Sequence, residues 1–207
     1  MGTTYHPRWY PQLDGSPKQN ENCGAASGGM LADRARKGVK PATPFPWLTK
    51  ITAQADGTGW RTPLPTMASA IRTWCTQRFA TNTVAGLYAK WIRAALKGMY
   101  GVDTGYAFGI DWATFAAFIV AGRGCIVAIN YAVVQGTKYA ASSFRGRHWL
   151  VVIERRKNAT TGLYQYLVFD PLADHRRAGI PQGPQWWPAA LLRRAFEATS
   201  TEVIYTV

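Results

Sequence analysis

Cys23 has the setting that a nucleophilic thiol needs. It stands in the stretch "NENCGAASGGML", with polar residues before it and small residues after it, so we expect it to begin a helix rather than line the middle of one. The partial positive charge at a helix N-terminus favours a thiolate and lowers the pKa of a thiol. Gly24, directly after it, would let a substrate backbone approach the sulfur. The alternative is that Cys23 is a small buried hydrophobic residue.

A thiolate nucleophile needs a general base, and the chain has three histidines. His148 begins the apolar run "HWLVVIE", which is typical of a strand, whereas His6 and His175 lie in polar or extended segments typical of a surface. Asp170 ends a second such run, "LYQYLVFD", where Pro171 stops the strand. If the two runs pair as a hairpin, His148 and Asp170 meet on one rim, and the carboxylate can orient the imidazole. Otherwise His148 is a structural residue at a strand edge.

Cys75 and Cys125 lack the setting of Cys23. Cys75 falls on the apolar face of a predicted helix over 67–79, and Cys125 lies in the apolar run "GCIVAINYAVV". Both are predicted to pack in the core as small hydrophobic residues. Three cysteines without paired spacing indicate neither a disulfide framework nor a zinc cluster, so no metal site is expected.

The elements that must position these residues fall into two groups along the chain. Helices are predicted over 23–35, 67–79 and about 84–97, and from Trp112 to Ile119 with Asp111 as the cap. Strands are predicted over 124–134, 148–154 and 163–170, followed by a short helix over about 188–198 and a closing strand over 201–207. Helices first and an antiparallel sheet second predict an α+β fold, here a single domain over residues 1–207. A site would lie in the cleft between the two halves.

The net charge of +13 predicts attraction to a polyanion, such as nucleic acid, anionic lipid or an anionic cell wall. The basic residues are scattered and no nucleic-acid-binding motif accompanies them, so we do not expect nucleic acid as the partner. No stretch approaches the ~20 apolar residues of a membrane span. The N-terminus has neither a basic start nor an apolar run, so no signal peptide is expected, and a role outside the cytoplasm would need release by another route.

Four segments, taken in order, resemble the papain-like cysteine peptidases of the bacteriocin-leader-processing type and the wider peptidase family thirty-nine-like group. The segments are "PQLDGSPKQNENCGAASGGML", "IDWATFAAFIVAGRGCIVAINY", "RGRHWLVVIE" and "YLVFDPLAD". Together they cover nearly the whole chain. Two positions depart from the family pattern: Ala25 stands where many relatives have proline, and Arg147 stands where glycine usually precedes the histidine.

The resemblance implies roles for four residues. Cys23 would be the nucleophile, His148 the general base and then acid, and Asp170 the orienting carboxylate. Relatives place a glutamine upstream of the cysteine to stabilise the oxyanion. The common spacing falls on a proline here, so Gln12 is preferred for this role and Gln19 remains the alternative.

The same resemblance bears on the substrate. It implies no metal and no organic cofactor. Relatives include cell-wall-cleaving lysins of bacteriophages, so a basic peptidase of this kind is expected to act on peptidoglycan, as a monomer unless it is part of a virion. It would reach the wall from the host cytoplasm after release, or from a virion. The alternatives are a peptidase that removes a leader or processes a phage assembly protein, and a structural or binding relative without turnover.

Overall fold

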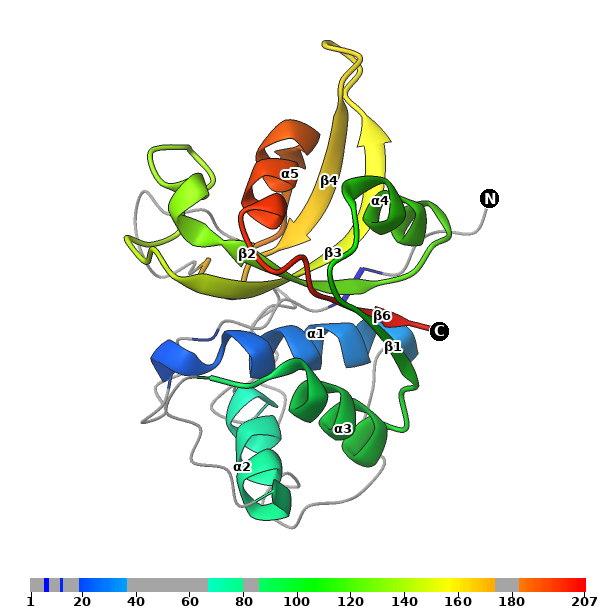
Figure 1. Ribbon diagram of the computed structural model, residues 1–207, viewed down its shortest axis with the longest axis vertical. Helices are drawn as coiled ribbons and strands as arrows, with labels where there is room; N and C mark the ends of the chain where they lie inside the picture. The colour runs from blue at the N-terminus through cyan, green and yellow to red at the C-terminus, as the bar shows by residue number, and fades with distance from the viewer. Residues whose placement is uncertain (1–5, 8–11, 13–18, 37–66, 80–85, 174–182) are drawn as a thin grey trace, which may run out of the picture.

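The chain folds into a helical half and a sheet half that lie against each other (Figure 1). The computed structural model describes residues 6–7, 12, 19–36, 67–79, 86–173 and 183–207. Most of the predicted arm over 5–17, the connection over 38–63 and His175 lie outside the described residues. Helices come first along the chain and most of an antiparallel sheet comes second, so the predicted α+β class is confirmed.

The helical half contains α1 (Cys23–Arg36), α2 (Met67–Phe79) and α3 (Ala89–Tyr100). Helix α1 runs between the sheet and the other two helices (Figure 1). All its residues from Gly24 to Asp33 are buried, because its many small side chains let neighbours approach on every side. At Gly28, for example, a Cβ would already lie 3.5 Å from Ile92 and 3.6 Å from Ile71. This close packing fixes the start of α1 relative to the sheet.

The sheet half is built on six strands in the order β1-β6-β2-β3-β4-β5, and every neighbouring pair is antiparallel. The strands are β1 (Thr104–Ala107), β2 (Cys125–Asn130), β3 (Arg147–Lys157), β4 (Tyr164–Phe169), β5 (Gln185–Pro188) and β6 (Val203–Thr206). Helices α4 (Trp112–Val120) and α5 (Ala189–Glu197) cover the face of the sheet turned away from α1 (Figure 1). Within the described residues, no helix is both long and apolar enough to cross a bilayer.

Most predicted elements agree with the structure to within a few residues. Asp111 caps α4 as expected, since its Oδ1 accepts a hydrogen bond from Thr114 N at 2.7 Å. Helix α3 begins later than the predicted residue 84. Gly86 has a φ of 85°, a left-handed conformation that no α-helix contains, so the helix begins only at Ala89.

Two strands were not predicted, and the segment after β2 was predicted incorrectly. Strands β1 and β5 are four residues each and form the two edges of the sheet, where pairing on one side only leaves a weak sequence pattern. The strand predicted over 124–134 is wrong in its last four residues, which form the 3-10 helix η2 (Tyr131–Val134). Asn130 ends β2 there, because its Oδ1 accepts a hydrogen bond from Ala132 N at 3.0 Å.

Candidate active site

The start of α1 presents Cys23 and is held in place by a buried arginine. The 3-10 helix η1 (Gln19–Glu21) leads into α1, and Asn22 O accepts the first hydrogen bond of the helix, from Ala26 N at 2.8 Å. Arg72 of α2 binds this turn through its guanidinium: Nε donates to Asn22 Oδ1 and Nη2 donates to Glu21 O, each at 2.6 Å, and Nη1 lies 3.5 Å from Glu21 Oε2. Sequence reasoning missed Arg72, because it lies 50 residues after Asn22 and carries no local signal.

Gly24 does not leave space for a substrate backbone, contrary to the prediction from its small size. The residue is buried, and a Cβ there would come within 2.9 Å of Ile92 Cδ1 and 3.3 Å of Trp149 Cδ1. Side chains of α3 and β3 therefore fill the space beside this glycine, so it is not open to a substrate backbone. The glycine is required because it lets α1 pack closely against both elements.

His148 and Asp170 form a buried, hydrogen-bonded pair on the sheet half. Strands β3 and β4 pair as the predicted hairpin, with His148 near the start of β3 and Asp170 directly after β4. His148 Nε2 lies 2.7 Å from Asp170 Oδ1, and the two residues are 1% and 4% exposed. Because the carboxylate occupies Nε2, Nδ1 is the ring nitrogen left to exchange a proton with a thiol.

A β-bulge decides that these two side chains lie on the same face of the sheet. Between the hairpin loop and the bulge, the register pairs Glu154 with Leu167. Continued unbroken, that register would set Asp170 opposite Val151, whose side chain points to the face opposite that of His148. The bulge shifts the register by one residue, so that Asp170 lies diagonally across from His148 on one face.

Two further donors hold the carboxylate of Asp170. Tyr131 OH donates to Oδ2 at 2.7 Å, and Leu172 N donates to Oδ1 at 2.8 Å. Tyr131 is fully buried, its ring packs edge-on against His148 at 5.0 Å between centroids, and its hydroxyl accepts a hydrogen bond from Ala141 N at 2.8 Å. Sequence reasoning missed Tyr131, since an aromatic residue in an apolar run is typical of a core residue.

Burial and neighbouring charges have opposite effects on the pKa values of Cys23 and His148. Burial opposes ionisation of the Cys23 thiol, but the hydrogen bond and charge of His148, with backbone N–H groups of Trp149 and Gly24, outweigh it and lower the thiol pKa. Burial also disfavours the imidazolium, but the charge and hydrogen bond of Asp170, followed by those of Cys23, raise the pKa of His148 to about 9. The lowered pKa of Cys23 and the raised pKa of His148 both favour the thiolate–imidazolium form over the neutral pair.

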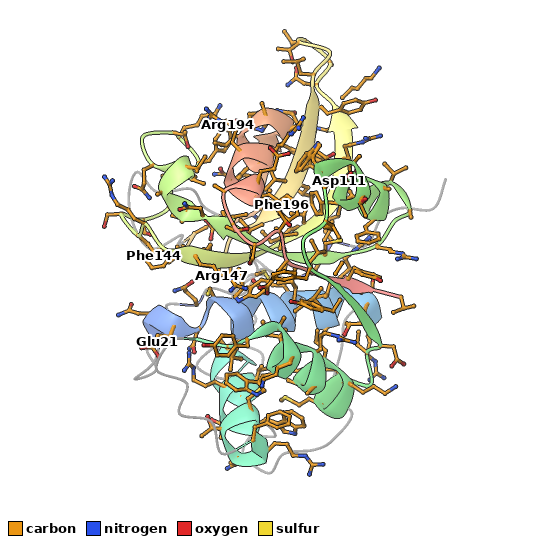
Figure 2. The ribbon with its side chains drawn as sticks, in the orientation of Figure 1. Glu21, Asp111, Phe144, Arg147, Arg194 and Phe196 are labelled. Carbon is orange, nitrogen blue, oxygen red and sulfur yellow. The ribbon has the colours of Figure 1, made fainter. Side chains whose placement is uncertain are left out.

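One cavity of about 320 Å³ is lined by Cys23, His148 and Gln12. Gln12 is 3% exposed, its Nε2 donates to Asn20 O at 3.2 Å, and its backbone N donates to Pro171 O at 2.8 Å. Residues 142–144 form another wall. Figure 2 shows Phe144 of the sheet half and Glu21 of the helical half at the same edge of the molecule, on either side of the start of α1. The side chain of Gln19 lies outside the described residues.

The other two cysteines are core residues, as predicted. Cys75 and Cys125 are fully buried, whereas Cys23 is half-buried. Burial raises the pKa of Cys75 to about 12 and also raises the pKa of Cys125. His6 is exposed, and its Nε2 lies 3.0 Å from Glu154 Oε2 in a surface contact. The three thiols therefore differ both in access to solvent and in their tendency to ionise.

Comparison with known proteins identifies a similar fold among solved structures. No protein-family model matches the chain, and neither does any curated protein. Solved structures do match, and one of them is described as a C39-like peptidase from Bacillus anthracis. That match covers 96% of this chain and 93% of the other, with a TM-score of 0.52 and 14% sequence identity. At this identity the likeness is one of fold, and it confirms the fold predicted from the sequence.

Proposed function

We propose that this protein is a cysteine peptidase in which Cys23 is the nucleophile, His148 the general base and acid, and Asp170 the orienting carboxylate. The observation that carries the proposal is the buried pair of His148 Nε2 and Asp170 Oδ1, 2.7 Å apart, in contact with the cavity that Cys23 lines. A carboxylate that orients an imidazole beside a nucleophile is the arrangement that acyl transfer uses. The likeness in fold to a C39-like peptidase supports the same activity.

The proposed reaction forms and then hydrolyses an acyl-enzyme. The Cys23 thiolate attacks the substrate carbonyl carbon, and Gln12 Nε2 and the Cys23 backbone N–H stabilise the developing oxyanion. His148 Nδ1–H then gives its proton to the leaving amine as the C–N bond breaks. In the second half, His148 Nδ1 takes a proton from water, hydroxide attacks the thioester, and the thiolate leaves. Asp170 keeps its charge throughout and balances that of the imidazolium.

The oxyanion assignment can be tested at Gln12. Its amide nitrogen carries two hydrogens, of which one is directed at Asn20 O, and the proposal assigns the other to the oxyanion. We expect Gln12→Ala to lower kcat on a soluble peptide by about a hundredfold, the usual scale for one lost donor. Gln19→Ala, the matched control, should lower it far less. A larger loss in the Gln19 variant would move the role to that residue.

Tyr131 is proposed as a positioning residue for Asp170. Tyr131→Phe removes one hydrogen bond to a buried carboxylate, worth about 1.5–3 kcal/mol. We expect kcat to fall about 10- to 100-fold while KM hardly changes, because a fully buried side chain offers no surface to the substrate. Tyr100→Phe is the control, since Tyr100 is equally buried but lies in α3. Equal losses of kcat in both variants would show a general packing effect.

The proposed substrate is the peptide part of peptidoglycan. The net charge of +13 supports attraction to an anionic cell wall, and the sequence resembles families that include wall-cleaving lysins of bacteriophages. The charge by itself fits other polyanions, and the fold is equally suited to a peptidase that processes a leader or an assembly protein. The substrate therefore needs a direct test.

Purified peptidoglycan digested with the protein and analysed by mass spectrometry provides that test. We expect fragments with new free amino groups and intact glycan chains, and none from the Cys23→Ala variant. An intact wall together with rapid alkylation of Cys23 at neutral pH would indicate a protein substrate instead. An intact wall together with a slowly alkylated Cys23 would indicate a relative that binds without turnover.

A further inference from the structure

A second cavity, which the proposed mechanism does not use, lies at the boundary between the two halves. Its volume is about 380 Å³. It is lined by the start of α3, by one residue of β1 and by one residue just before β6: Tyr88, Ala89, Lys90, Trp91, Arg93, Tyr106 and Glu202. Aromatic walls with a few charged groups are the usual composition of a ligand site.

Arg147 and Trp149, which flank His148 in the chain, make hydrogen bonds at or beside the wall of this cavity. Arg147 Nη2 donates to Glu202 Oε2 at 2.6 Å, and the Arg147 guanidinium lies 4.8 Å from the ring of Trp149. Trp149 Nε1 donates to Leu87 O at 3.1 Å, directly before the cavity wall at Tyr88. Figure 2 shows Arg147 between the sheet half and the helical half. Two residues that flank His148 in β3 thus make contacts at the cavity wall, Arg147 with Glu202 and Trp149 with the residue before Tyr88.

The charge balance of the cavity is positive. Glu202 is 8% exposed, and Arg147 already neutralises its carboxylate. Lys90 and Arg93 have no ion-pair partner among the described residues. Arg93 Nη2 donates to Thr104 O at 2.9 Å, while its enclosed Nε has no hydrogen-bond partner in the described part of the chain. Within the described residues, Lys90 and Arg93 thus line the cavity without an ion-pair partner, while Arg147 pairs with the carboxylate of Glu202.

We propose that this cavity is a substrate subsite that holds a carboxylate-bearing residue of the chain to be cleaved, an inference that rests on the proposed peptidase function. The guanidinium of Arg93 can bind a carboxylate through directed N–H donors, and Lys90 adds charge. Tyr88 and Tyr106 are 55% and 39% exposed, and with Trp91 they offer aromatic faces to the apolar stem of the bound residue. A neutral amide in the same place would leave both cations uncompensated.

Binding of two matched peptides to the Cys23→Ala protein tests this subsite without turnover. The probes are acetyl-Ala-Glu-Ala-amide and acetyl-Ala-Gln-Ala-amide, titrated at low ionic strength into 15N-labelled protein while the indole N–H resonance of Trp91 is followed. We expect the glutamate peptide to shift this resonance and to bind at least about tenfold more tightly than the glutamine peptide, the scale of a charge-assisted hydrogen bond. Equal affinities, or shifts confined to the cavity of Cys23, would overturn the proposal.

Matched charge variants separate the subsite from the general positive surface. Arg93→Gln should abolish the preference for glutamate, whereas Lys97→Gln should keep it, because Lys97 lies later on α3 and pairs with Asp103 at 2.7 Å. If the Arg93→Gln variant does not fold, Lys90→Gln replaces it, because Lys90 is exposed. This variant must then reduce the preference for the glutamate peptide over the glutamine peptide. Retention of the preference in Arg93→Gln, or equal loss in Lys97→Gln, contradicts the subsite. An active enzyme without the preference would overturn the subsite alone. An inert wild-type thiol in a protein that keeps the preference would overturn the peptidase function and leave only a carboxylate-binding cavity.

Discussion

Replacement of Cys23 by serine is expected to lower peptide hydrolysis by about 10⁴-fold or more. A serine hydroxyl does not ionise near neutral pH, so the residue loses the thiolate that His148 and two backbone N–H groups stabilise. Thermal stability should change little, by about 1 kcal/mol at most, because Cys23 is half-buried at a helix start rather than within the core. Turnover of a soluble peptide and a thermal melt measure the two effects.

Alkylation with iodoacetamide provides a second readout of the same substitution. In the native wild-type protein at neutral pH, Cys23 should be modified first, because burial encloses Cys75 and Cys125 and raises the pKa of both thiols. The Cys23→Ser variant should then show almost no fast labelling. Hydrolysis that persists in this variant would end the proposed mechanism, whatever the labelling shows.

Local sequence signals were sufficient to predict several parts of the fold and the candidate site. The cap at Asp111 and the helix start at Cys23 are both indicated by neighbouring residues in the sequence, and both lie where predicted. The hairpin of β3 and β4 is also local, because one short loop joins two apolar runs. These features place His148 and Asp170 at one end of the hairpin.

The remaining parts depend on contacts between distant segments. Arg72 holds the turn before Cys23 from another helix, and Tyr131 reaches Asp170 from a segment that the apolar pattern assigned to a strand. Gly24 was interpreted from its neighbours as an opening for a substrate, although packing against Ile92 accounts for it. No periodicity reveals such contacts, because each depends on how two separate elements meet.

The β-bulge in β3 shows most sharply why a correct pairing does not by itself give a correct site. The hairpin could be predicted from its two apolar runs, but its register beyond Glu154 could not. A one-residue difference in register moves a side chain to the other face of a sheet. The meeting of His148 and Asp170 thus depends on a feature that the alternation of residues does not show.

Asp170→Asn is expected to lower turnover at neutral pH by about 10²- to 10⁴-fold with the fold retained. The asparagine oxygen can still accept the hydrogen bond from Leu172 N, but the negative charge beside His148 is lost. Tyr131 OH, which donates to Oδ2 in the wild type, would then face an amide N–H₂ group. The loss of that acceptor costs about 1–3 kcal/mol of stability, which a thermal melt would detect.

The pH profile of kcat/KM distinguishes loss of this charge from a general structural defect. In the wild type, the thiolate–imidazolium pair exists from the lowered pKa of Cys23 up to the raised pKa of His148, so activity should fall as pH rises through about 9. Without the carboxylate charge the pKa of His148 falls, and the alkaline limb should move to lower pH by about one to three units. Asp111→Asn is the matched control: asparagine also caps a helix, and Figure 2 shows Asp111 well away from Phe144 at the cavity of Cys23. An unmoved alkaline limb in Asp170→Asn, or the same displacement in Asp111→Asn, would remove Asp170 from the proposed triad.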